Sequence, residues 1–271
     1  MTWISSIAAP LLVALTFIQT QAPPPPAKPW EPSIGMAGKD VVWVPSSPAM
    51  VEKMLDIAKV TPQDFVIDLG SGDGRMVIAA AKRGARAQGV EFTPEMVEYS
   101  RKSAREAGVE GKATFVQGDM YEADISKATV LALFLLPHNL DKLKDKLLAL
   151  KPGSRVVLNT YEVTGWEADE TFRMEGDCTS WCTVLLHYVP APVAGTWRIG
   201  DGELRLGQDF QKVSGELTAG GVTNAVTGRL RGDQITMTIG GVEYTGKVDG
   251  DRMQGTRGAN KQAWTATRRP A

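Results

Sequence analysis

Three glycines at alternate positions separate a strand-forming run from a helix-forming run, and this stretch constrains the fold more than any other. Residues 65–69 are apolar apart from Asp68 and partly β-branched, which predicts a buried parallel strand. Gly70, Gly72 and Gly74 follow, and residues 76–81 favour a helix. A strand, a glycine turn and a helix present backbone amides and a helix N-terminus to a ligand at the carboxyl edge of a sheet. The stretch therefore predicts an α/β fold with a ligand site directly after the first strand.

The glycine spacing distinguishes between two ligand classes. A dinucleotide fingerprint, G-x-G-x-x-G, would need its third glycine at the position that Arg75 occupies. The pattern is instead D-x-G-x-G-x-G, beginning at Asp68. It resembles the first motif of the class I S-adenosylmethionine-dependent methyltransferases. An ordinary tight turn is the alternative, so the later strands must supply further ligand contacts.

Strands and helices alternate after the glycine turn, which predicts βαβ units and a parallel sheet. A further helix before the turn is predicted to be capped by Ser46 or Ser47, with Pro48 in its first turn. A late strand at residues 183–189 is predicted to pair back through a hairpin from Tyr161. The resemblance implies a Rossmann-like seven-stranded methyltransferase sheet. The predicted strands are residues 86–91, 113–116, 129–134 and 155–158, and the predicted helices residues 93–107 and 140–150.

The resemblance also assigns cofactor contacts at the ends of successive strands. Asp68 would hold the glycine turn and meet the amino group of S-adenosylmethionine. Glu91 would accept both ribose hydroxyls, because a carboxylate can accept two hydrogen bonds at once. Asp119 would accept from the adenine amino group, and Met120 would pack on the ring. The full implied cofactor set is Asp68, Gly70, Ser71, Gly72, Gly74, Glu91, Phe92, Asp119 and Met120.

The fourth predicted strand bears on the methyl acceptor. Methyltransferases of amide or base nitrogens carry an Asn/Asp-Pro-Pro-aromatic motif there, whereas this chain has Leu-Leu-Pro-His-Asn at residues 135–139. Three features stand out in residues 41–160: Val44-Pro45-Ser46-Ser47 before the first helix, the glycine turn at residues 68–75, and an apolar fourth strand ending in Pro137. Together they resemble the protein-lysine methyltransferases that modify the c-subunit of ATP synthase, and their bacterial relatives. That resemblance implies a protein substrate, with a membrane protein as one form of it. His138 and Tyr161 are the candidates for a catalytic base, and a structural or surface role is the alternative for each.

The net charge and the few histidines and cysteines bear on whether the protein binds nucleic acid or a metal. The net charge of −1 gives no electrostatic reason to expect nucleic acid. With two histidines and two cysteines, the chain offers almost no material for a His/Cys metal cluster, so no metal is expected. The spacing of Cys178 and Cys182 allows a disulfide across a bend. We expect the bond in an oxidising compartment and two free thiols in the cytoplasm.

Both ends of the chain differ in character from the predicted methyltransferase domain at residues 41–191. Residues 4–18 are almost wholly apolar, so residues 1–22 are predicted to be a signal peptide or an uncleaved membrane anchor, with a buried N-terminal helix as a further alternative. Residues 23–40 are predicted to be a proline-rich linker, with no packed structure before about Val41. We therefore expect an exported (periplasmic) or membrane-anchored protein.

The C-terminal residues 193–271 have a different texture. Fifteen of the 28 glycines lie between Gly195 and Gly258, and short alternating runs are separated by the hairpin turns 231–233 and 249–251. This predicts a small antiparallel β domain, as a half-barrel or a small barrel. Trp197 near its start and Arg268 near its end resemble the closing strands of lipocalin-like barrels.

Three functions remain open at this point. The first is a membrane-associated or exported methyltransferase acting on a protein lysine. The second is a non-catalytic extracytoplasmic binding protein that retains the cofactor fold, because S-adenosylmethionine is made and used in the cytoplasm. The third is a small-molecule methyltransferase with the C-terminal domain as a lid.

Overall fold

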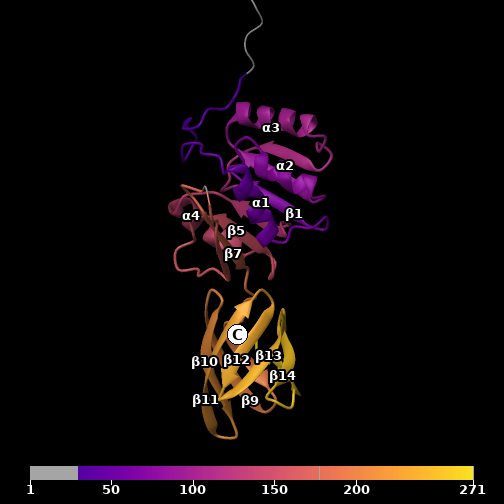
Figure 1. Ribbon diagram of the computed structural model, residues 1–271. Coiled ribbons are helices and arrows are strands. Elements are labelled where there is room, and N and C mark those ends of the chain that lie inside the picture. Colours follow the sequence, from indigo (N-terminus) through magenta and orange to yellow (C-terminus); the bar gives the residue numbers. More distant parts are fainter. Residues whose placement is uncertain (1–29, 177, 271) are drawn as a thin grey trace, which may run out of the picture. The chain divides into compact units, whose positions relative to one another are not determined.

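The computed structural model describes residues 30–176 and 178–270, and Figure 1 shows its elements. A seven-stranded sheet has the order β3-β2-β1-β4-β5-β7-β6. The first five strands in sequence run parallel, and β7 pairs antiparallel with both β5 and β6. The predicted α/β sheet is confirmed. Its strands are β1 (Phe65–Leu69), β2 (Arg86–Glu91), β3 (Ala113–Gln117), β4 (Val130–Leu133), β5 (Arg155–Asn159), β6 (Glu170–Arg173) and β7 (Thr183–Tyr188).

Alternate residues of the central strands enter two separate cores, one on each face of the sheet. Val66 and Val130 belong to the core that also contains the buried sides of α1, α2 and α3. Ile67 and Leu131 belong to the other core, with the buried side of α4. Strands covered on both faces explain the continuous apolar runs in the sequence. The helices are α1 (Pro48–Ile57), α2 (Arg75–Lys82), α3 (Pro94–Glu106) and α4 (Pro137–Leu148).

The structure differs from the prediction in the start of one helix and in the pairing of one strand. Helix α4 begins at Pro137, three residues before the predicted start, because proline is well suited to the first helical position. The late strand β7 does not simply pair back from Tyr161. It lies between β5 and the short strand β6, which the polar residues 170–173 did not reveal. Ser47 is confirmed as the cap of α1, with its hydroxyl accepting from the Met50 amide at 3.2 Å.

The prediction that nothing packs before Val41 is wrong. Residues 36–44, called the N-terminal strap below, fold back on themselves through an Ala37–Val42 bridge and a hydrogen bond from the Trp43 amide to the Met36 carbonyl. Trp43 supplies the reason, because its indole packs on the glycine turn and holds the strap against the sheet.

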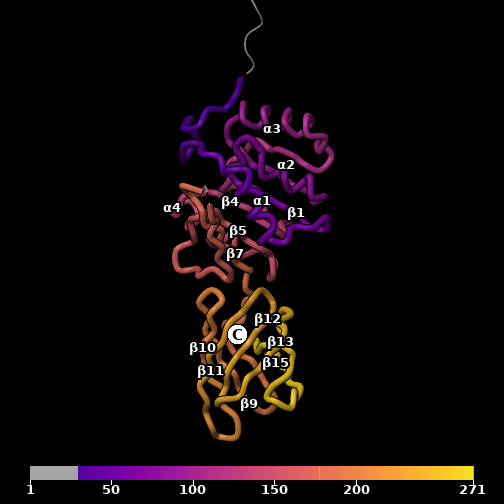
Figure 2. The backbone as a smooth tube through the Cα atoms, viewed as in Figure 1, coloured from indigo at the N-terminus to yellow at the C-terminus, as the bar shows by residue number. Residues whose placement is uncertain are grey.

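The C-terminal strands close into an eight-stranded barrel with the order β10-β11-β12-β13-β14-β15-β8-β9 (Figure 2). Neighbouring strands in sequence pair antiparallel, and β15 returns to β8. This confirms an antiparallel β domain, as a full barrel. The strands are β8 (Gly195–Ile199), β9 (Gly202–Asp209), β10 (Lys212–Ala219), β11 (Val222–Arg231), β12 (Gln234–Ile239), β13 (Val242–Asp249), β14 (Arg252–Arg257) and β15 (Gln262–Arg268).

Side chains fill the barrel. Ile235, Met237 and Ile239 alternate inward along β12, and Trp197 is fully buried. The Arg268 guanidinium lies 4.3 Å from the centre of a Trp197 ring and donates to the carbonyls of Pro192 and Ala194. The Trp197 indole donates to the Val193 carbonyl at 2.8 Å. The two residues singled out in the sequence therefore meet where the barrel closes.

Residues 1–22, predicted to be a signal peptide or anchor, and most of the predicted linker lie outside the described residues. Within residues 30–176 and 178–270, the helices are all too short or too polar to cross a bilayer.

His187 gives the sheet a predictable acid sensitivity. The imidazole is fully buried on β7, with its ring centre 4.7 Å from that of Trp166. Burial lowers the pKa of His187 to about 4 and outweighs the effect of the Glu167 backbone, which raises it. A depressed pKa means stability that is present above the ordinary value of 6.5 and lost as pH falls towards 4. In the parent protein the free energy of unfolding should fall by roughly 3 kcal/mol across that pH range because of His187. We expect this fall to be absent in His187→Leu. Urea unfolding at several pH values measures it, and parallel curves for parent and variant would contradict it.

Candidate active site

The glycine turn joins β1 to α2 in a conformation that only glycine adopts easily. Gly70, Gly72 and Gly74 have φ of 75°, 53° and 80°. A Cβ on Gly72 would lie 2.3 Å from the Trp43 indole nitrogen, and one on Gly74 would lie 2.6 Å from the Phe115 ring. The alternate glycines are therefore required both by the backbone and by close packing on each side of the turn.

Glu91 ends β2 and holds this turn in place. Its Oε2 accepts from the Gly72 amide at 2.9 Å, and its Oε1 accepts from the Thr93 amide at 2.9 Å. Each carboxylate oxygen keeps a second lone pair for a ligand. The carboxylate is thus oriented before any ligand arrives, at a position where it can accept two hydroxyl groups.

Asp119 follows β3, and its carboxylate contacts both the turn after β3 and the strap. Its Oδ1 accepts from the Tyr121 amide at 2.9 Å, and its Oδ2 forms an ion pair with Lys39. The hydrogen bond from Lys39, followed by that from the Tyr121 amide, holds the pKa of Asp119 below its usual range. The Lys39 ammonium also lies 5.1 Å from the centre of the Phe92 ring. Lys39 was not singled out in the sequence, although the apolar run at residues 41–44 was a signal for the strap that carries it.

A cavity of about 290 Å³ collects these groups along the carboxyl edge of the sheet. Of the predicted cofactor residues, Gly70, Glu91, Phe92, Asp119 and Met120 line it. Asp68 and Ser71 line a smaller hollow that shares Gly70. Gly72 and Gly74 are buried within the turn itself. Tyr161 lines the cavity, whereas His138 is exposed in the first turn of α4 and is not among the lining residues.

The residues present fit S-adenosylmethionine. Asp68 is buried with no hydrogen-bond partner among the described residues, and the Ser71 hydroxyl is likewise unpartnered. Burial, then the negative charges of Glu91 and Asp73, raise the pKa of Asp68 to about 8. A cationic ligand would relieve this crowding of carboxylates. The individual roles of these residues remain predictions.

The matching family model, described as the ANTKMT methyltransferase domain, spans residues 68–170. A protein-lysine N-methyltransferase of Saccharolobus islandicus is 44% identical over 138 residues, which cover 50% of this chain and 86% of that enzyme. The chain belongs to this family of class I S-adenosylmethionine-dependent methyltransferases.

Two further relatives of the methyltransferase carry different names. The mouse ATP synthase c-subunit lysine N-methyltransferase is 36% identical over 140 residues, which span 51% of this chain and 56% of the mouse protein. A crystal structure described as an RNA methyltransferase from Salinibacter ruber, in complex with S-adenosyl-L-homocysteine, is 43% identical. It superposes with a TM-score of 0.52 and covers 55% of this chain and 96% of that one. These matches confirm the enzyme class and the cofactor predicted from the glycine motif.

The raised pKa of Asp68 predicts that the methyltransferase takes up its cofactor with release of a proton. Below about pH 8 the free site holds a protonated Asp68, and a sulfonium and an ammonium favour the carboxylate form. Binding should therefore strengthen as pH rises towards 8, and Asp68→Asn should remove this dependence. Titration calorimetry in buffers of different ionisation enthalpy counts the protons. Binding of equal strength across this range, without proton release, would contradict the prediction.

Proposed function

We propose that this methyltransferase methylates the ε-amino group of a lysine in a protein. The observation that carries the proposal is the 44% identity to a protein-lysine N-methyltransferase over 86% of that enzyme. The cavity supports it, because its charged lining residues are one base, Lys39, and three acids, Asp40, Glu91 and Asp119. A negative lining favours a cationic side chain and disfavours phosphate.

The chain's own part in the reaction is alignment and exclusion of water. When bound, S-adenosylmethionine supplies a methyl group on a positively charged sulfur. Glu91 and Asp119 are proposed to hold its ribose and adenine, and Asp68 its amino group. Trp43 covers the glycine turn, where Gly72 is buried. A neighbouring positive charge lowers the pKa of an incoming lysine, which favours the neutral amine that must attack.

A membrane protein is the proposed form of the substrate. Relatives are named for the c-subunit of ATP synthase and, in mouse, for adenine nucleotide translocase. The experiment is to incubate the enzyme and methyl-labelled S-adenosylmethionine with membrane and soluble fractions, and to map the label by mass spectrometry. Label on lysine that falls with Glu91→Ala, the variant expected to bind S-adenosylmethionine more weakly, supports the proposal. Label confined to other residues or to small molecules would overturn it.

RNA is the second candidate substrate, favoured by the description of the Salinibacter relative as an RNA methyltransferase. Total RNA therefore forms a third arm of the same experiment. We expect it to remain unlabelled, because the chain carries a net charge of −1.

We further propose that residues 4–18 direct the protein to the membrane or through it. The Cys178–Cys182 disulfide fits an oxidising compartment. If the domain faces such a compartment, rapid alkylation of intact cells under denaturing, non-reducing conditions should leave both cysteines unmodified. Two alkylated thiols would place the domain in a reducing compartment, which would overturn export through the membrane and leave an anchor with its domain inside the cell.

A further inference from the structure

The cavity has two halves with different chemistry. The side after β2 and β3 contains Glu91, Asp119 and Met120, which are assigned to the adenosine part of the cofactor. The side after β4 and β5 is lined by aromatic rings. Among these rings only Tyr161 has a predicted role, as a candidate base. Because the methyl acceptor must reach the same cavity from another direction, this second half is where it would enter.

Three rings form this aromatic wall: Phe134 after β4, Tyr161 after β5, and Trp181 before β7. The Phe134 and Tyr161 rings are stacked with centres 6.2 Å apart and planes 9° from parallel. Trp181 meets Phe134 edge-on at 5.7 Å. The Trp181 indole donates to the Tyr161 hydroxyl at 3.2 Å, so the three side chains orient one another.

Trp181 is presented by a short disulfide loop. Cys178 and Cys182 are bonded, with Cα atoms 5.8 Å apart, and Trp181 is the residue directly before the second cysteine. Its φ of 55° is an unfavourable conformation for a bulky side chain, and its side chain remains 41% exposed. Burial alone therefore does not hold the ring in place.

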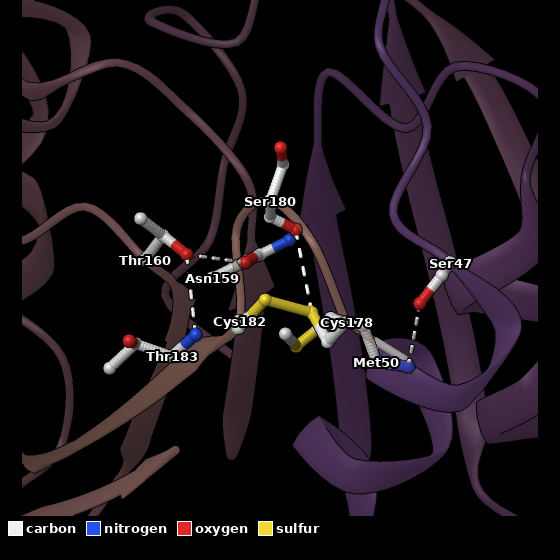
Figure 3. Close-up of a disulfide and its surroundings, with 8 residues drawn as sticks. All are labelled: Ser47, Met50, Asn159, Thr160, Cys178, Ser180, Cys182 and Thr183. Atoms are coloured by element: carbon white, nitrogen blue, oxygen red, sulfur yellow. Dashed lines mark hydrogen bonds between the residues drawn. A yellow bond between two sulfur atoms is a disulfide. The ribbon is translucent and has the colours of Figure 1, made fainter. Parts of the chain in front are cut away.

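The loop is anchored at the end of β5, as Figure 3 shows. In Figure 3 the Thr160 hydroxyl accepts from the Thr183 amide at 3.5 Å and donates to Asn159 Oδ1 at 3.0 Å. The Thr160 amide also donates to the Thr183 carbonyl at 2.7 Å. Thr160 itself has a φ of 64° and directly precedes Tyr161. The disulfide loop and the turn that carries Tyr161 are thus one connected unit.

We propose that Phe134, Tyr161 and Trp181 form the subsite for the acceptor amine, and that the Cys178–Cys182 disulfide keeps Trp181 in it. This inference rests on the proposed lysine substrate. Aromatic faces pack well on the methylene stem of a lysine and attract a methylated ammonium by cation–π interaction. A wall without a cationic side chain suits this occupant. Trp181 is a positioning residue that shapes the entrance for the substrate.

The test is a bisubstrate probe used with the full chain. It is an S-adenosylhomocysteine analogue whose sulfur is replaced by nitrogen carrying a short arm with a secondary amine and a butyl tail. The matched probe has an ether oxygen in place of that amine. We expect the amine probe to bind the parent roughly tenfold more tightly than the ether probe, as a desolvated cation–π contact allows.

Trp181→Ala should abolish this preference, and Trp181→Phe should keep most of it. Phe172→Ala, which removes a partly exposed ring of β6 outside the cavity lining, should leave it unchanged. S-adenosylhomocysteine should bind all four proteins equally, which shows that each is folded. Equal binding of the two probes to the parent, or a preference that survives in Trp181→Ala, would overturn the subsite.

The disulfide is tested in the same assay. A dithiol reductant gives two electrons and two protons to the disulfide, yielding two cysteine thiols and the oxidised reductant. Reduction of the parent should lower the preference for the amine probe, and a Cys178→Ser/Cys182→Ser variant should show the lowered preference with or without reductant. A preference unchanged by both treatments would overturn the role of the disulfide. A strong amine preference without any methylated protein lysine would instead overturn the proposed substrate and leave the amine subsite standing.

Discussion

Replacing Glu91 by alanine is expected to weaken binding of S-adenosylmethionine by about 1–3 kcal/mol, or roughly 5- to 150-fold in Kd. Two effects combine. The ribose would lose its charged acceptor, and the amides of Gly72 and Thr93 would lose the carboxylate that orders the turn. Titration calorimetry with S-adenosylmethionine measures the change directly.

Glu95→Ala is the matched control for this variant. Glu95 has the same side chain, four residues further on, but it is exposed in the first turn of α3 and does not line the cavity. It should bind the cofactor as the parent does. If Glu91→Ala also binds normally while folded, the carboxylate is not a cofactor ligand, and the assignment of the adenosine side of the cavity fails.

The second large effect is expected at the third glycine of the turn. Gly74→Ala should lower the free energy of unfolding by about 2–4 kcal/mol, because it adds an overpacked methyl to a left-handed backbone. The new Cβ would lie 2.6 Å from the Phe115 ring and 2.9 Å from the Ser100 side chain. Ser100 is fully buried and donates to the Gly72 carbonyl at 2.9 Å, so a shift there would also disturb the turn.

Gly108→Ala separates the two contributions. Gly108 also has a positive φ, 66°, but a Cβ there would have nothing within 4 Å. It should lose only the backbone part, about 1 kcal/mol. Equal losses in the two variants, measured by urea unfolding, would show that the packing around Gly74 adapts at no cost.

The sheet was predictable because its signals are local. β-branched runs, glycine turns and proline-started helices each occupy a few neighbouring residues, and Ser47 and the turn at residues 70–74 behave as their sequences predict. The strap was not predictable, because its packing depends on Trp43 meeting a turn that lies about thirty residues away in sequence. Trp181 was missed for the same reason. Its partners Phe134 and Tyr161 come from two other strand ends.

The candidate site shows the same division. Acids placed directly after strands were found by counting strands, and the cavity collects Glu91 and Asp119. His138 was singled out by its position after the fourth strand, but helix α4 begins at Pro137 and leaves the imidazole exposed and outside the cavity lining. Helix phase, which a single proline set, decided that outcome.

The ion pair between Lys39 and Asp119 has a consequence for how fast the cavity exchanges its contents. Both partners are partly exposed, and such pairs contribute less than about 1 kcal/mol and weaken further in salt. The ion pair is therefore only a weak contact between the strap and the residues after β3. We expect raised ionic strength to weaken this pair and so to speed the exchange of cofactor, within the limit set by the packing of Trp43 on Gly72.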